Sequence, residues 1–200
     1  MSMGANTNII IAGVGGQGTV LASKLVARAA MDAGLRVRTS ETIGMAQRGG
    51  SVVSHVRVSE APIASPLMAP GMADLLIGFE PGEAVRSLAF LRPGGTIVTN
   101  AQPVAPVAVS PTSAAYSGPA MLERLDGCGA RLAVIDGAAI CAEIGSLKVL
   151  NVALLGAAAG LGALGFSLDQ FETAIRESVR ERFVDMNLRA LHAGARSASA

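Results

Sequence analysis

Short apolar runs alternate with amphipathic stretches along most of the chain. Residues 8–12 are almost wholly apolar, which is typical of a central parallel strand buried on both faces of a sheet. From Thr19, apolar residues recur every three or four positions until Gly34, so this stretch predicts a helix that ends at the glycine. Residues 36–39 predict the next strand. This order of strand, glycine turn, helix and strand is the opening of a doubly wound sheet.

Further strands and helices follow along the chain. The pattern predicts strands at residues 51–58, 74–79, 96–100 and 132–135, a helix at 82–91, a turn at 93–95, loops at 40–50 and 101–119, and helices after the last strand. We therefore expect one α/β domain over residues 1–193. It would contain a single Rossmann-like, doubly wound, mostly parallel sheet with helices on both faces and additional C-terminal helices. Residues 194–200 are expected to form a disordered tail.

The composition favours a soluble protein that does not bind nucleic acid. Half of the 200 residues are apolar and 16% are charged, so the chain can bury a sizeable core, and its net charge of +1 provides no basic surface. Residues 149–168 carry no charge over a length that would span a membrane. They are rich in Ala and Gly without flanking aromatic residues, which favours a buried helix. The polar N-terminus does not resemble a signal peptide, so we expect a soluble, cytoplasmic protein.

The chain has few residues that typically bind metals. Its two cysteines, Cys128 and Cys141, form no CxxC pair, and an iron–sulfur cluster needs about four such ligands. We expect them to be reduced and mostly buried thiols. His55 and His192 are far apart in the sequence and have no metal-ligand spacing. No metal site is therefore expected on this chain.

The glycine-rich turn after the first strand is the strongest local motif. A GxGxxG sequence between a strand and a helix lets the backbone turn tightly and points helix N-terminal N–H groups at an anion. The same glycines can also serve only to pack the helix against the strand. An acidic residue at the end of the second strand would hold ribose hydroxyls in a dinucleotide site. The candidate residues are Gly13, Gly15, Gly16, Gln17 and Gly18 in the turn and Glu41 at the second strand.

Two further segments contain candidate binding residues. Arg48 precedes Gly49 and Gly50, so a planar guanidinium lies on a backbone that can approach a ligand or partner closely; the alternative is a solvated loop arginine. Glu80 follows a buried strand, at the edge where doubly wound folds bind ligands. The alternative is that Glu80 only caps the next helix.

Taken in order, the motifs resemble one family. They are the glycine turn, GMAQRGGS at 44–51, HVR at 55–57, ADLL at 73–76 with EP at 80–81, the glycine pair at 94–95, Asn100, and NL at 187–188. The chain resembles the gamma subunit or domain of the 2-oxoacid:ferredoxin oxidoreductases, and most of all the small beta subunit of the indolepyruvate oxidoreductases. The resemblance runs from about residue 8 to residue 194, and QRGG is its most specific part.

The resemblance implies a subunit of a complex that oxidatively decarboxylates a 2-oxoacid to an acyl-CoA and passes the electrons to ferredoxin. Thiamine diphosphate, magnesium and iron–sulfur clusters would lie on a larger partner subunit, because this chain lacks the cluster cysteines and a diphosphate–magnesium motif. The chain would contribute no catalytic residue, be inactive alone, and could form a homodimer. The glycine turn and the Arg48 loop would contact CoA phosphates or the catalytic subunit. A free-standing, NAD-type nucleotide-binding dehydrogenase is the alternative.

Overall fold

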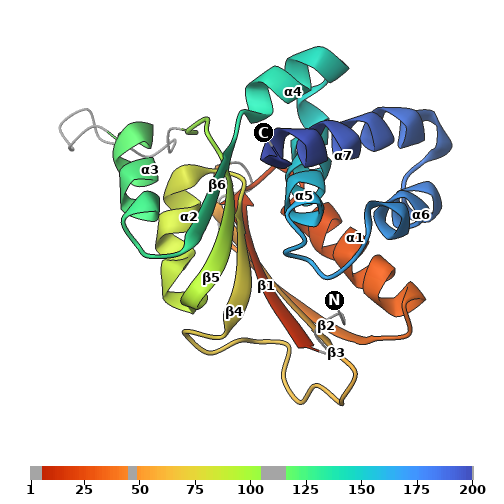
Figure 1. The fold of residues 1–200 in the computed structure, drawn as a ribbon, viewed down its shortest axis with the longest axis horizontal. Coiled ribbons are helices and arrows are strands. Elements are labelled where there is room, and N and C mark those ends of the chain that lie inside the picture. Colours follow the sequence, from red (N-terminus) through yellow and green to blue (C-terminus); the bar gives the residue numbers. More distant parts are fainter. Residues whose placement is uncertain (1–5, 45–48, 105–115, 200) are drawn as a thin grey trace.

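The protein forms one sheet between two layers of helices (Figure 1). The computed structural model describes residues 6–44, 49–104 and 116–199. The strands are β1 (Asn6–Val14), β2 (Arg36–Ile43), β3 (Ser51–Ser59), β4 (Ala73–Gly78), β5 (Leu91–Asn100) and β6 (Arg131–Ile135), in the spatial order β2-β3-β1-β4-β5-β6. Strands β1, β4, β5 and β6 are parallel, whereas β3 is antiparallel to both of its neighbours. The predicted mostly parallel α/β fold is confirmed.

Helices cover both faces of the sheet (Figure 1). One face carries α1 (Thr19–Asp32), α5 (Leu150–Gly160), α6 (Leu168–Ser178) and α7 (Val184–Ser199); the other carries α2 (Pro81–Ser87) and α3 (Gly118–Asp126); α4 (Gly137–Ile144) follows β6. Ile9 and Ile11 of β1 belong to the core beneath the first set of helices. Ile10 and Ala12 belong to the core beneath the second set. The continuous apolar run of β1 therefore arises because both faces of this strand are buried.

The position of β3 could not be read from the sequence pattern. This strand lies between β1 and β2, so that Ile11 pairs with Ser54, and Ser54 pairs with Glu41. Strand β2 is therefore an edge strand, separated from β1 by one whole strand. In the usual dinucleotide-binding fold the second strand lies directly beside the first.

Several predicted element boundaries were wrong. Strand β2 continues to Ile43, into the predicted loop at 40–50. The predicted helix at 82–91 begins at Pro81 and ends at Ser87, and a 3-10 turn (Leu88–Phe90) leads directly into β5. The predicted turn at 93–95 lies inside β5, where the pairing with β4 shifts register. Of the predicted loop at 101–119, residues 105–115 lie outside the described part, and α3 begins at Gly118.

The expected disordered tail from residue 194 was also wrong, because α7 continues to Ser199. Small residues let the backbones of α7 and α5 come into direct contact. A Cβ at Gly194 would lie 1.8 Å from the Ala153 carbonyl oxygen, and a Cβ at Gly156 would lie 2.0 Å from that of Leu191. The buried helix predicted within 149–168 is present as α5. None of the described helices is long and apolar enough to cross a membrane.

Candidate functional site

The carboxyl ends of the parallel strands meet the first turns of several helices at one edge of the sheet. Strand β1 ends at Val14, β4 at Gly78 and β5 at Asn100, and α1, α2 and α4 begin beside them. Doubly wound folds bind ligands at this edge. Two adjoining pockets of about 200 and 330 Å³ open here, and Val104 lines both.

We name the two pockets after their polar side chains. The smaller one, the acidic pocket, is lined by Val14, Gly49, Ser51, Glu80, Glu83, Arg86, Val104 and Tyr116. The larger one, the amide pocket, is lined by Gly16, Gln17, Asn100, Gln102, Val104, Gly137, Ala138, Cys141, Leu147 and Leu150. Of the predicted site residues, Gly49 and Glu80 thus line the acidic pocket, and Gly16 and Gln17 line the amide pocket.

The glycine turn joins β1 to α1 in a conformation that favours glycine. Gly16 and Gly18 have φ values of 99° and 83°, in the left-handed region. The Gly15 N–H donates to the Gly50 carbonyl oxygen at 2.9 Å, which ties the turn to the segment that precedes β3. Gly18 is the N-cap residue of α1, and within the described ranges no side chain caps this helix. The N-terminus of α1 is therefore open to an anion in a way that a capped helix is not.

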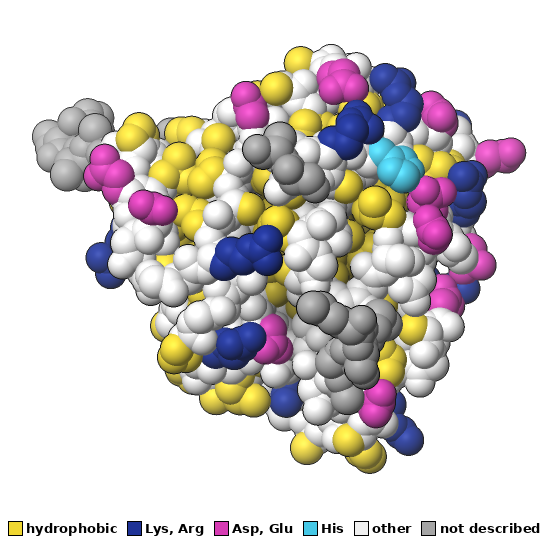
Figure 2. Space-filling model, viewed as in Figure 1, with side chains coloured by type: hydrophobic (Ala, Val, Ile, Leu, Met, Phe, Trp, Pro, Cys, Tyr) yellow, Lys and Arg dark blue, Asp and Glu magenta, His cyan; other side chains and the backbone are white. Residues whose placement is uncertain are grey.

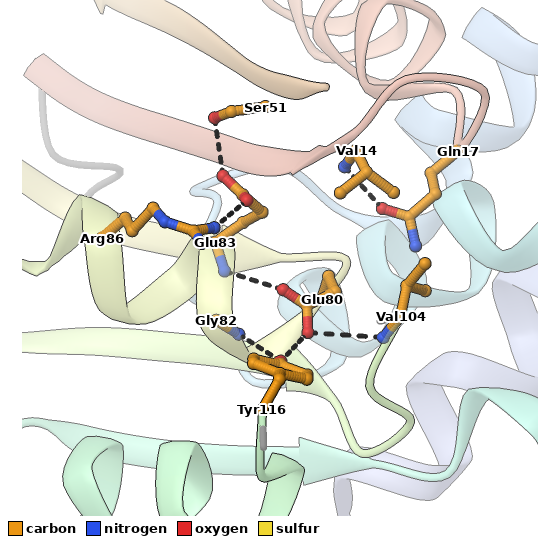
Figure 3. Close-up of polar contacts among 9 residues, drawn as sticks. All are labelled: Val14, Gln17, Ser51, Glu80, Gly82, Glu83, Arg86, Val104 and Tyr116. Atoms are coloured by element: carbon orange, nitrogen blue, oxygen red, sulfur yellow. Dashed lines mark hydrogen bonds and ion pairs between the residues drawn. The ribbon is translucent and has the colours of Figure 1, made fainter. Parts of the chain in front are cut away.

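Gln17 points back into the protein and supports the turn (Figure 3). Its Oε1 accepts a hydrogen bond from the Val14 N–H at 2.8 Å, and its Nε2 donates to the Phe79 carbonyl oxygen at 3.2 Å. The amide thereby joins the end of β1 to the end of β4. Gly13 lies against this amide, because a Cβ there would come within 2.8 Å of the Gln17 Oε1. The structure thus gives Gly13 and Gln17 packing and positioning roles.

Two further amide side chains, those of Asn100 and Gln102, line the amide pocket. Asn100 Nδ2 donates to the same Phe79 carbonyl at 3.3 Å, and Asn100 Oδ1 accepts from the Gly137 N–H at 3.2 Å. Gln102 Oε1 accepts from the Ala138 N–H at 3.1 Å. These contacts occupy the first two N–H groups of α4 with oxygens from the chain itself.

The third N–H group of α4, that of Ala139, donates to the side chain of Asp136. Asp136 is the N-cap of α4 and accepts from the Ala139 N–H at 3.0 Å and from Gln102 Nε2 at 2.9 Å. The hydrogen bond from Ala139, and after it the one from Gln102, favours the ionised carboxylate. Together they lower the pKa of Asp136 below its usual value. The N-terminus of α4 is therefore already capped, in contrast to that of α1.

Two buried glutamates define the acidic pocket (Figure 3). Glu80 is 2% exposed and Glu83 is 4% exposed. Glu80 Oε2 accepts from the Glu83 N–H at 2.9 Å, so Glu80 caps α2, as the alternative interpretation of this residue expected. Its Oε1 accepts from the Tyr116 hydroxyl and, at 3.4 Å, from the Val104 N–H.

The second glutamate has its own partners. Glu83 accepts from the Ser51 hydroxyl at 2.6 Å and forms an ion pair with Arg86, whose side chain is 57% exposed. Burial is the main cause of a raised pKa of Tyr116, and the hydrogen bond to Glu80 is the second. The Tyr116 hydroxyl therefore stays protonated and donates its hydrogen. Among the described residues lining the pocket, two carboxylates thus face a single guanidinium. This arrangement favours cations and hydrogen-bond donors over phosphate.

The two remaining predicted site residues are Glu41 and Arg48. Glu41 is on the edge strand β2 and accepts from the Ser23 hydroxyl of α1 at 3.0 Å, with β3 between it and β1. This position does not match that of the acidic ribose ligand in a dinucleotide site. Arg48 lies outside the described residues.

Sequence reasoning missed much of the polar framework at this edge. Tyr116 is the only tyrosine of the chain and follows a proline-rich stretch, which was the one available signal for it. Ser51, Gln102 and Asp136 gave no signal, because their partners are at least 32 residues away or belong to a helix whose start was not predicted. In the described ranges, no group of three or more His, Cys, Asp or Glu side chains is arranged to hold a metal ion.

Comparisons with known proteins place this geometry in a family. The family model for pyruvate ferredoxin/flavodoxin oxidoreductase matches residues 8–197. The indolepyruvate oxidoreductase subunit IorB of Archaeoglobus fulgidus is 39% identical over 188 residues, which cover 94% of this chain and 92% of the relative.

Two solved structures have the same fold. The gamma subunit of the keto/oxoacid ferredoxin oxidoreductase from Geobacter sulfurreducens matches with a TM-score of 0.72 and 24% identity, over 96% of this chain and 98% of that one. The 2-oxoglutarate:ferredoxin oxidoreductase from Magnetococcus marinus, with 2-oxoglutarate, coenzyme A and succinyl-CoA bound, matches with a TM-score of 0.73 and 20% identity. The match covers 98% of this chain but 31% of the matched chain.

These comparisons do not support a free-standing nucleotide-binding dehydrogenase, and neither does the position of Glu41. The resemblance noted from the motifs is confirmed over nearly the whole length of the protein. The chain belongs to the pyruvate ferredoxin/flavodoxin oxidoreductase family.

Proposed function

We propose that this chain is the small subunit of a complex that oxidises indolepyruvate or a related 2-oxoacid to its acyl-CoA and passes the electrons to ferredoxin. The observation that carries the proposal is the 39% identity to an indolepyruvate oxidoreductase subunit, with 94% of one chain and 92% of the other covered. The match therefore extends over nearly the full length of both sequences. The larger Magnetococcus protein contains the same fold as 31% of one chain.

The residues of this chain do not fit the redox groups of such a reaction. Cys128 is exposed and Cys141 is buried, and two cysteines do not supply the roughly four ligands of an iron–sulfur cluster. We therefore assign the clusters to a larger partner subunit, together with thiamine diphosphate and magnesium, for which this sequence has no recognisable diphosphate–magnesium motif. The contribution of this chain is to bind and orient CoA or the partner.

The electrostatics of the two pockets indicate how CoA would be oriented. Its phosphates would avoid Glu80 and Glu83 in the acidic pocket and favour the uncapped N-terminus of α1 at the glycine turn. The amide pocket combines Gln17, Asn100 and Gln102 with apolar side chains. It suits the uncharged, amide-containing part of the ligand. Arg48, next to Gly49 of the acidic pocket in sequence, is the proposed cation for a phosphate or for the partner subunit.

Reconstitution tests the proposal. The chain and a candidate larger subunit, recognised by thiamine-diphosphate and ferredoxin-type cysteine motifs, are purified separately and together. Indolepyruvate- and CoA-dependent reduction of ferredoxin is then measured. We expect activity only from the combination. Activity of this chain alone, or full activity of the larger subunit without it, would refute the proposal.

Arg48→Ala distinguishes binding from folding. It should leave the melting temperature unchanged and weaken CoA use or subunit assembly by about 1.5–3 kcal/mol, as expected for a lost hydrogen bond to a charged group. Arg38→Ala, on the exposed edge strand β2, is the matched control. Wild-type CoA dependence and wild-type assembly of Arg48→Ala would leave Arg48 as a solvated loop residue.

A further inference from the structure

His55 is a buried histidine in the middle of β3, within the HVR segment at 55–57, which contributes no residue to either pocket. Its side chain is 5% exposed, and its Nδ1 lies 3.2 Å from the backbone nitrogen of Met68. A backbone N–H always donates, so Nδ1 accepts this hydrogen bond. The imidazole is therefore neutral and carries its proton on Nε2.

Met68 is the point at which the connection between β3 and β4 enters the core. This connection, residues 60–72, contains no helix or strand and runs at the end of the sheet opposite the two pockets (Figure 1). Met68 is its one buried residue, at 4% exposure, and belongs to the core beneath α2 and α3. The neighbouring Leu67 is 53% exposed, and apolar side chains reach the surface at this end of the molecule (Figure 2).

Hydrogen bonds beyond both ends of residues 66–70 make this segment a short flap. On one side, Arg57 Nη1 donates to the Ser65 carbonyl oxygen at 2.9 Å. On the other, the Gly71 N–H donates to the Ala89 carbonyl oxygen at 2.9 Å. The flap begins and ends with proline, whose ring fixes φ. Its two ends are therefore anchored and its backbone is stiff.

The bond from Met68 to His55 is the flap's one hydrogen bond to the sheet among the described residues. The orientation of the accepting ring is fixed by Phe90, which packs edge to face on it, with 5.1 Å between ring centroids and 83° between ring planes. Burial lowers the pKa of His55 below its usual value of about 6.5. The bond is therefore intact at neutral pH.

Protonation of His55 reverses the character of this contact. An imidazolium ring donates from both nitrogens and accepts at neither, so the Met68 N–H would face a second N–H. A buried N–H without an acceptor is unfavourable, and the flap has no other hydrogen bond to the sheet that would keep it in place.

The charged residues around the ring do not favour the imidazolium. On its face of the sheet, the charged neighbours from β3 and β2 are Arg57 and Arg38, which lie opposite each other. The opposing residue of β1 is Ile10, and residues 88–90 contain no ionisable group. The other charged groups nearby are paired or exposed: Glu83 with Arg86, Asp74 with Arg92, and Glu60 at the surface. Two cations close to the ring disfavour a third.

We propose that His55 is a proton-controlled latch for residues 66–70. The neutral ring holds this flap against the sheet, and the protonated ring releases it, while the anchors at Ser65 and Gly71 keep the rest of the connection in place. Release moves Met68 out of the core. The latch is closed at neutral pH and opens as the pH falls below about 6.5.

Amide hydrogen exchange of the full chain, followed by NMR together with the ring signals of His55 from about pH 4 to 8, tests the latch. We expect the protection factor of the Met68 amide to fall roughly tenfold or more as His55 becomes protonated. The Gly71 amide, which donates to Ala89, is the internal control and should keep its protection factor.

Two replacements separate the acceptor from the proton. His55→Asn keeps an acceptor oxygen near the position of Nδ1 but does not titrate, so the Met68 amide should stay protected over the whole pH range. His55→Phe keeps an aromatic ring without the acceptor, so this amide should be weakly protected throughout. His192→Asn is the matched control, because the His192 side chain is 44% exposed, and it should behave like the wild type.

A constant protection factor for Met68 while His55 titrates overturns the latch, as does a loss on acidification in His55→Asn equal to that of the wild type. Parallel losses at Met68 and Gly71 would mean that the connection opens as a whole, which also overturns the proposal. If His55→Phe does not fold, the pH series of the wild type and His55→Asn still decide between these outcomes.

Discussion

Replacing Gly18 by alanine tests how the glycine turn is held against α5. Gly18 has a φ of 83°, and a side chain in this region costs about 1 kcal/mol. A Cβ there would also lie 2.6 Å from Nδ2 of Asn151, which is 2% exposed and donates to the Gly18 carbonyl at 3.3 Å. The amide must therefore move away from the new methyl group, which removes a hydrogen bond that contributes about 1 kcal/mol. We expect Gly18→Ala to lower the free energy of unfolding by about 2–3 kcal/mol.

Urea denaturation of the full chain measures this loss. Gly34→Ala is the matched control, because Gly34 has a φ of 78° but a Cβ added there would meet nothing within 4 Å, so it should lose only about 1 kcal/mol. The double variant Gly18→Ala with Asn151→Ala should lose less than the sum of the single variants, since the clash is absent. Equal losses for Gly18→Ala and Gly34→Ala would refute the described contact between the turn and α5.

Three further predictions concern other contacts. Hydrogen bonds lower the pKa of Asp136 in the folded state, so its ionised form stabilises the fold above the usual carboxyl pKa of about 4, and this contribution is lost as the pH falls through the folded-state pKa. The free energy of unfolding is measured for the wild type and Asp136→Asn over a range of acidic pH. The difference between the two should shrink as the pH falls, and a constant difference would contradict this role of Asp136. Gly194→Ala should lower the free energy of unfolding by about 1–3 kcal/mol through overpacking on Ala153, whereas an unchanged urea midpoint would mean that α7 is not docked there. Tyr116→Phe leaves Glu80 Oε1 with only the 3.4 Å contact to Val104, so thermal melting should show a loss of about 1–3 kcal/mol; wild-type stability would exclude Tyr116 as the partner.

The local elements were predictable because local interactions determine them. The apolar run of β1, the glycine turn and the three- and four-residue spacing of α1 all lie within residues 6–32, and the structure has them in that order. The capping function of Glu80 was likewise one of the two interpretations available from sequence, since a cap contacts residues three positions away. The family motifs depend on the same short segments.

The sequence by itself determined the α/β class, the glycine turn and the family, because those depend on residues close together in the chain. Only the tertiary structure decided that β3 separates β2 from β1, which moves Glu41 away from the glycine turn. Strand pairing joins segments whose apolar patterns fit several neighbours equally well, so the order is settled by packing of the whole sheet. The helix at the C-terminus was likewise decided by tertiary packing. Gly194 stabilises α7 only because Ala153, 41 residues earlier, lets the two backbones touch.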